Sequence, residues 1–250
     1  MTHPIIAGAE PWSHQGGSNG ALVLHGFTGN CNSMRGIAEA LAAAGFSVEL
    51  PLLPGHGTHI DDMLPTTFSD WSAHAEASYQ SLAARCDKVV VAGLSMGGTL
   101  TAWITGHHPE VVGAAFVNPA VEPQDDALRG ILVETLAAGT AVINGIGSDI
   151  ADPASTETAY SETPLAPLIT MFDGIGEIQP LLPKIVCPVI ILTSPQDHVV
   201  QPSASDHLAV SVGGPVERVS LDRSYHVATL DYDRELVESS IVAFAQRVCG

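Results

Sequence analysis

The chain has 250 residues, of which 46% are hydrophobic and 14% charged, a composition typical of a well-packed globular protein and not of a disordered one. Its formal net charge is −18, from 27 acidic and 9 basic residues, and such a field repels phosphate backbones, so we expect no nucleic-acid partner. Because the chain shows neither a run of 18 apolar residues nor a basic-then-apolar leader, we expect no membrane span and a cytoplasmic location.

Short apolar strands alternate along the chain with amphipathic helices. The pattern predicts strands over 21–24, 46–53, 88–94, 111–119, 187–194 and 216–221, and helices over 33–44, 68–85, 96–106 and 234–248. Continuous Val, Ile and Leu runs between helices are typical of a parallel sheet that is covered on both faces. We therefore predict an α/β fold with a mainly parallel central sheet flanked by helices.

The stretch 120–182 interrupts this alternation, since it contains helix-like pieces, prolines and small polar residues but no convincing strand. It is inserted after the strand that ends near Val117, and the carboxyl edge of an open α/β sheet is where ligands bind. We expect 120–182 to form a small cap, or lid, over a core made of 1–119 and 183–250. The alternative is a set of surface helices without a function.

A serine framed by glycines follows the strand 88–94. The residues Gly93-Leu94-Ser95-Met96-Gly97 fit the G-x-S-x-G nucleophile elbow, a sharp strand-to-helix turn that lifts the serine hydroxyl out of the sheet. Glycine at 93 and 97 would leave room around this strained turn. The pattern predicts that Ser95 is a nucleophile.

A serine nucleophile needs a base, usually a histidine that a carboxylate orients. In the nucleophile-elbow hydrolases the order along the chain is Ser, then Asp or Glu, then His, each following a strand. Asp197 follows the strand 187–194, and His226 follows the strand 216–221. We therefore expect Asp197 and His226 to complete a catalytic triad, with Asp222 as the alternative acid.

The oxyanion that develops during attack on an ester needs hydrogen-bond donors. One is the backbone N–H of Met96, which follows the serine at the start of a helix. The other is expected from the loop "LHGFTGN" after the first core strand, where Phe27 is positioned to offer its N–H.

The loop "GHGTHIDD" superficially suggests a metal site. It carries His56, His59, Asp61 and Asp62 within a glycine-rich turn, but no further ligand cluster accompanies it. We expect these side chains to hold the loop by hydrogen bonds, and we expect no metal and no cofactor.

Several segments together resemble the bacterial monoacylglycerol lipase and carboxylesterase group of α/β-hydrolases: "LHGFTGN", "SMRGIAEALAAAGFSVELPLLPGHGTH", "TTFSDW", "GLSMGGTL" and "SYHVATLDYD". The resemblance implies an α/β-hydrolase fold and cofactor-free hydrolysis of carboxylic esters by Ser95, Asp197 and His226. It also implies that the Phe27 and Met96 amides form the oxyanion hole.

The resemblance extends to the cap segment "INGIGSDIADPASTETAYSETP". By this similarity Ile146 would line the acyl or glycerol region and Glu157 would face the glycerol hydroxyls, with Phe27 as a further substrate contact. We expect an apolar acyl tunnel under the cap, formed by positions such as Leu132, Leu136, Val142, Ile143 and Ile146.

These observations favour a serine ester hydrolase that cleaves monoacylglycerols or similar small monoesters through an acyl-enzyme intermediate. A thioesterase or an amidase with the same triad is the first alternative, and a ligand receptor on a hydrolase scaffold is the second, because a fold alone does not choose among them. The expected partner is a small-molecule ester, and the chain is expected to be a monomer or a homodimer.

Overall fold

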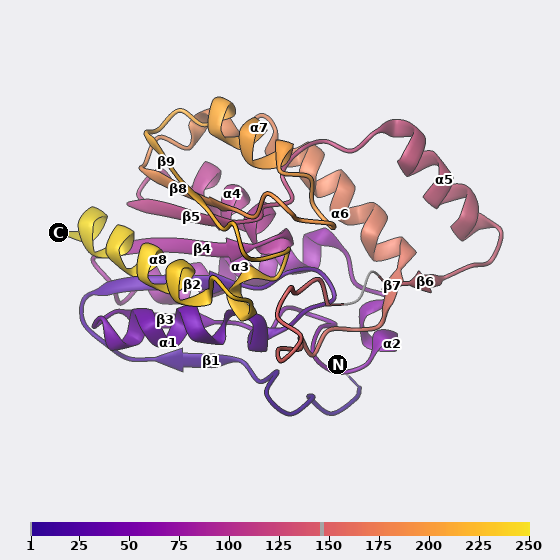
Figure 1. Ribbon diagram of the computed structural model, residues 1–250, viewed down its shortest axis with the longest axis horizontal. Helices are drawn as coiled ribbons and strands as arrows, with labels where there is room; N and C mark the ends of the chain where they lie inside the picture. The colour runs from indigo at the N-terminus through magenta and orange to yellow at the C-terminus, as the bar shows by residue number, and fades with distance from the viewer. Residues whose placement is uncertain (1, 146–147) are drawn as a thin grey trace.

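A computed structural model describes residues 2–145 and 148–250 (Figure 1). Seven strands form one sheet in the order β1-β3-β2-β4-β5-β8-β9. All neighbouring pairs are parallel except the edge strand β1, which is antiparallel to β3. The strands are β1 (Trp12–His14), β2 (Asn19–Leu24), β3 (Ser47–Leu50), β4 (Lys88–Leu94), β5 (Gly113–Val117), β8 (Val189–Thr193) and β9 (Val216–Ser220). The predicted α/β fold with a mainly parallel sheet is confirmed.

Helices cover both faces of the sheet because successive strand residues point to opposite faces, and both faces are apolar. Ala21 and Val23 pack with helices α1 (Arg35–Ala43) and α8 (Arg234–Cys249). Leu22 and Leu24 pack on the other face with α3 (Phe68–Ala83) and α4 (Met96–His107), and α7 (Ser203–Ser211) covers that same face near β8. The remaining short helices are η1 (Cys31–Met34), α2 (Ile60–Met63), η2 (Leu182–Lys184) and η3 (Ala228–Leu230).

The region 120–182 contains α5 (Asp126–Ala137), β6 (Val142–Asn144), β7 (Glu162–Pro164) and α6 (Leu165–Ile178). The expectation of no strand here is wrong, since β6 and β7 pair antiparallel. Each has three residues, which is too few for an alternating pattern to reveal. Helix α6 is packed into the core through Met171 and Ile175, whereas α5 stands away from the sheet and packs on α6 (Figure 1).

The edge strand β1 is a second element that the apolar pattern does not reveal. Its residues Trp12–His14 are half-buried or exposed, so they carry no apolar run.

No helix among the described residues has both the length and the apolar character to cross a membrane.

Candidate active site

Ser95 occupies a strained turn between a buried strand and a buried helix. Strand β4 ends at Leu94, α4 begins at Met96, and Ser95 has φ 56° and ψ −117°. A β-carbon on Gly93 would lie 2.1 Å from the Gly97 carbonyl oxygen, and one on Gly97 would lie 2.1 Å from the Leu24 carbonyl oxygen. Only glycine fits these two positions, and the tight packing holds the serine in a backbone conformation that it would otherwise avoid.

The loops after β8 and β9 bring a carboxylate and an imidazole together. Asp197 Oδ2 lies 2.7 Å from His226 Nδ1, and both side chains are buried. The other carboxylate oxygen accepts hydrogen bonds of 2.8 Å from the backbone N–H groups of Val199 and Val200. With Nδ1–H donating to the carboxylate, Nε2 of His226 is left as the basic nitrogen.

The alternative acid lies elsewhere. Asp222 is exposed, and its carboxylate accepts a hydrogen bond from the Ser220 hydroxyl. Of the two carboxylates that the sequence offered, it is Asp197 that bonds to the His226 ring.

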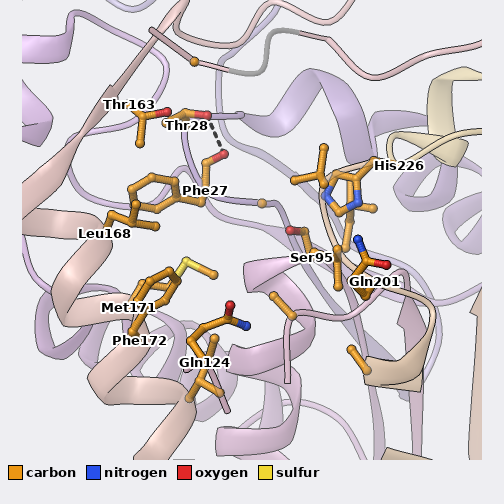
Figure 2. Close-up of a pocket in the computed structure, with 18 of the residues that line it drawn as sticks. Phe27, Thr28, Ser95, Gln124, Thr163, Leu168, Met171, Phe172, Gln201 and His226 are labelled. Carbon is orange, nitrogen blue, oxygen red and sulfur yellow. Dashed lines mark hydrogen bonds between the residues drawn. The ribbon is translucent and has the colours of Figure 1, made fainter. Parts of the chain in front are cut away.

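Ser95 and His226 line one cavity of about 470 Å³ together with Phe27 and Glu157. Figure 2 shows Ser95 and His226 at one side of the cavity and Leu168, Met171 and Phe172 of α6 at the other. The volume and the largely apolar wall are typical of a small-molecule site.

The apolar wall does not come from the positions that the sequence predicted. Leu132 packs against Leu165 and Ile169, Ile143 is 39% exposed, and neither lines the cavity. Leu136 and Val142 are likewise absent from its lining, and Ile146 lies outside the described residues. The expectation fails for Leu132 and Leu136 because these two residues of α5 pack on α6. The apolar wall contains Leu168, Met171 and Phe172 of α6, with Leu128 from α5.

The loop after β2 lies directly against Ser95. A β-carbon on Gly26 would be 3.4 Å from the Ser95 β-carbon, and Phe27 follows it. Thr28 has φ 59°, and its hydroxyl donates to the Phe27 carbonyl oxygen over 2.6 Å (Figure 2). Neither the Phe27 nor the Met96 backbone N–H donates to an acceptor within 2–145 and 148–250. Both amides are therefore free to bind a substrate oxygen.

Glu157 reaches the cavity from the region 120–182. Its Oε1 would be 2.9 Å from a β-carbon on Gly29, so the carboxyl group sits on the loop beside the serine. Burial raises the pKa of Glu157, and the nearby His226 ring and Ser33 hydroxyl offset part of this rise. A carboxyl group at this place can exchange hydrogen bonds with hydroxyl groups of a ligand.

The segment after Glu157 is tied to the core. Asn30 Nδ2 donates to the Thr158 carbonyl oxygen over 2.6 Å. The Tyr160 hydroxyl donates to the Gly55 carbonyl oxygen over 2.8 Å and accepts from the Thr58 N–H over 3.0 Å. These bonds join this part of the region 120–182 to the loops that follow β2 and β3.

The histidine-rich loop is held by hydrogen bonds, as the sequence predicted. The buried His56 ring is bonded to the Pro54 carbonyl oxygen over 3.0 Å, and Asp62 accepts from the backbone N–H groups of Thr2 and His3. The His59 ring accepts from the Asp61 N–H at the start of α2.

Three side chains in this region carry atoms that could act as ligands of a metal ion. Atoms of His3, His59 and Asp61 lie within 4.8 Å of one another at the surface. None of these three side chains lines the cavity that contains Ser95.

Sequence reasoning missed Asn118, a buried residue at the end of β5. Its Oδ1 accepts from the Ser194 N–H over 2.8 Å, and its Nδ2 donates to the His226 carbonyl oxygen over 2.8 Å. Asn118 has φ 42°, a region in which asparagine is enriched among non-glycine residues. An asparagine between a buried strand and Pro119 is the only local signal of this role.

Known proteins resemble this chain in sequence and in structure. A family model described as serine aminopeptidase, S33 matches residues 19–233. The chain is 42% identical to a thermostable monoacylglycerol lipase of Bacillus sp. (strain H-257), over 98% of this chain and 97% of that protein. It is 22% identical to a carboxylesterase of Bacillus subtilis (strain 168), over 96% of this chain and 97% of that protein.

Solved structures show the same likeness. A structure from work on two metagenome-derived lipolytic enzymes, LipS and LipT, has a TM-score of 0.91 and 39% identity, over 98% of this chain and 100% of that chain. The monoacylglycerol lipase of Paleococcus ferrophilus has a TM-score of 0.75 and 18% identity, over 96% of this chain and 99% of that chain. This second likeness concerns the fold alone.

Proposed function

Because the chain belongs to the serine aminopeptidase S33 family of α/β-hydrolases, we propose that it cleaves monoacylglycerols and similar small monoesters through an acyl-enzyme intermediate. The resemblance that the sequence motifs suggested and the predicted α/β-hydrolase fold are both confirmed by the comparisons. The observation that carries the proposal is the 2.7 Å hydrogen bond between His226 Nδ1 and Asp197 Oδ2, in a histidine that lines one largely apolar cavity together with Ser95.

In the proposed reaction Ser95 is the nucleophile. His226 Nε2 takes the proton of the Ser95 hydroxyl while Ser95 Oγ attacks the ester carbonyl carbon. Asp197 holds the ring in the required tautomer and stabilises the imidazolium. The negative charge on the former carbonyl oxygen is met by the backbone N–H groups of Phe27 and Met96, and the N-terminus of α4 adds its dipole.

The tetrahedral intermediate then collapses and the carbon–oxygen bond to the alcohol breaks. The imidazolium of His226 gives its proton to the leaving alcohol oxygen, and the acyl group stays on Ser95. A water molecule repeats the attack with His226 again as base, and the carboxylic acid is released. The cycle consumes one ester and one water, and it needs no other reactant.

The cavity wall supports an assignment of the two substrate ends. Leu168, Met171 and Phe172 of α6 offer an apolar surface opposite Ser95 (Figure 2), which suits an acyl chain. The Glu157 carboxyl group lies against the loop that follows β2, beside Ser95, where it can bind the two free hydroxyl groups of glycerol. A second acyl group would remove one of these hydroxyls and add bulk next to Glu157.

The test is a hydrolysis panel at one acyl length: mono-, di- and triacylglycerol, an acyl-CoA, an acyl amide and an aminoacyl anilide. We expect monoacylglycerol to be cleaved well and di- and triacylglycerol very weakly, because a site that binds hydroxyls leaves its polar group unpaired when they are filled. Faster cleavage of the amide or the thioester would replace the proposal with that activity, and efficient triacylglycerol hydrolysis would overturn the glycerol site.

The control for this panel is Ser95→Ala, which should lower kcat by about 10⁴- to 10⁶-fold while the fold persists. A fluorophosphonate should label Ser95 in the wild type, and a covalent adduct on another serine would overturn the nucleophile assignment.

A further inference from the structure

A carboxylate of the cap region joins the two loops that carry Asp197 and His226. Asp149 Oδ2 accepts a hydrogen bond of 3.0 Å from the His226 backbone N–H and one of 3.1 Å from the His198 backbone N–H. Its Oδ1 lies 2.9 Å from His198 Nδ1. One side chain therefore bonds to the backbone of the histidine and to that of the residue next to the acid.

The main chain of Asp149 adds a further bond to the same loop. The Val227 N–H donates to the Asp149 carbonyl oxygen over 3.1 Å. The backbone N–H groups of two successive residues, His226 and Val227, therefore both donate to Asp149. The Asp149 side chain is 10% exposed, whereas its partner His198 is 57% exposed. Because this carboxylate has little contact with water, these hydrogen bonds offset the cost of burying it. In return, it satisfies the backbone N–H groups that donate to it.

A second carboxylate fixes where this part of the cap region sits. Asp231 is fully buried and accepts from the Ala151 N–H over 2.7 Å and from the Asp152 N–H over 3.0 Å. The same side chain accepts from the Tyr225 N–H over 2.9 Å, one residue before His226. Asp149 is thus held at a defined place beside the histidine loop.

We propose that Asp149 is a positioning residue that sets the spacing of the two loops and, with it, the geometry of the Asp197–His226 hydrogen bond. The inference rests on the triad proposed above. Asp149 does not line the cavity, so it acts on the reaction through His226 and not on the substrate. The cap region then has a role in catalytic geometry besides covering the site.

The reason for a large effect lies in the loops themselves. Asp197 and His226 come from different strands, β8 and β9, and each belongs to a loop after its strand. A displacement of about 1 Å between reacting groups can cost about 10²-fold in rate. A shared carboxylate that bonds to both backbones restricts this displacement at low cost, because it is charged and its hydrogen bonds are strong.

The experiment compares Asp149→Ala and Asp149→Asn with Asp152→Ala. Asp152 is a matched control because its carboxylate accepts from the Ala154 N–H and the Ser155 hydroxyl, both within its own segment. For a short nitrophenyl ester we expect Asp149→Ala to lower kcat by about ten- to a hundredfold with KM changed less than about twofold. Asp149→Asn keeps one acceptor oxygen and should fall between Asp149→Ala and the wild type, and Asp152→Ala should match the wild type.

The second readout is the downfield proton resonance of His226 Nδ1–H, which reports the bond to Asp197 without any substrate. It should weaken and exchange faster with water in Asp149→Ala, and should be unchanged in Asp152→Ala. Unchanged kcat and resonance in the Asp149 variants, with or without a lower Tm, would overturn the inference. If Asp149→Ala does not fold, Asp149→Asn provides both measurements. A wild type that has the resonance but cleaves no ester would overturn the proposed function instead.

Discussion

The side-chain amide of Asn118 donates a 2.8 Å hydrogen bond to the carbonyl oxygen of His226. Its Oδ1 accepts from the backbone N–H of Ser194, three residues before Asp197, and the Ser194 hydroxyl in turn donates to the Tyr225 carbonyl oxygen. The end of β5 is therefore bonded to both loops that carry the proposed acid and base. Asn118 bonds to these loops from the end of the sheet, and Asp149 bonds to them from the region 120–182.

Asn118→Asp should lower both activity and stability. The carboxylate has the same shape and can still accept from the Ser194 N–H, but it has no N–H for the His226 carbonyl oxygen, so two oxygens would face each other. An unpaired buried group costs about 1–3 kcal/mol. We expect the free energy of unfolding, measured in urea, to fall by at least this amount, and we expect kcat to be lower. The exposed Asn144 provides the control Asn144→Asp, and equal behaviour of the two variants would remove Asn118 from this role.

Asp197→Asn and Asp222→Asn should differ strongly in kcat. Loss of the carboxylate that bonds to His226 Nδ1 changes the tautomer and removes the stabilisation of the imidazolium, which costs about 10⁴-fold in a triad. Asp222 is exposed and bonded to Ser220, so its replacement should leave kcat near that of the wild type. If Asp197→Asn lowered kcat only slightly and Asp222→Asn lowered it strongly, the acid would be Asp222 and not Asp197.

Glu157→Gln should stabilise the protein at neutral pH. Burial raises the pKa of Glu157, so the folded state binds its proton more tightly than the unfolded chain does. The stability from this group is fully present below the ordinary glutamate pKa of about 4.3, and it is lost as the pH rises through the raised value. The Tm of Glu157→Gln should therefore exceed that of the wild type at pH 7 and approach it near pH 4. A Tm difference that does not vary with pH would contradict this.

The same carboxyl group provides a test of the glycerol site. Glu157→Ala should lower kcat/KM for monoacylglycerol more than for a nitrophenyl ester of equal chain length, because the nitrophenyl group has no hydroxyls to bind. Gln124 also lines the cavity but is exposed, so Gln124→Ala serves as the control. Equal losses on both esters would show that Glu157 acts on something other than glycerol.

Two buried histidines should make the protein sensitive to acid. Burial lowers the pKa of His25 to about 4 and that of His56 to about 3, so both rings are neutral in the folded state near neutral pH. The unfolded chain binds these protons below about pH 6.5. The stability from the neutral rings is thus fully present above about pH 6.5 and is lost as the pH falls through the lowered values.

This loss can be measured as the slope of the unfolding free energy between pH 6.5 and 4.5. His56→Gln should make the slope shallower than in the wild type, whatever its effect on stability at pH 7. The exposed His14 is the control, since His14→Gln should leave the slope unchanged. Parallel curves for the wild type and His56→Gln would mean that another group is responsible.

The local pattern of the sequence determined much of the fold. The run "KVVVAGL" predicted a buried strand and corresponds residue for residue to β4. Its buried positions 89–94 are apolar because the strand is covered on both faces. The glycines around Ser95 predicted the turn that follows, since their backbone neighbours leave no room for a β-carbon. The sequence also predicted Asp197 and His226 as candidates, each by its place after a predicted strand, although β9 before His226 is polar and partly exposed.

Only the tertiary structure decided which elements meet. Asp197 and Asp222 both follow a strand, and the difference between them is the 2.7 Å contact of Asp197 with His226. Leu132 and Leu136 of α5 pack on α6 and not around the cavity. No apolar periodicity predicts the contacts of Asp149 and Asn118, because these contacts are hydrogen bonds of polar side chains. Periodicity in a sequence reports that one face of an element is buried, but not which partner buries it. Hydrogen bonds between residues about 77 and 108 positions apart follow from the packing of whole elements, which no short stretch encodes.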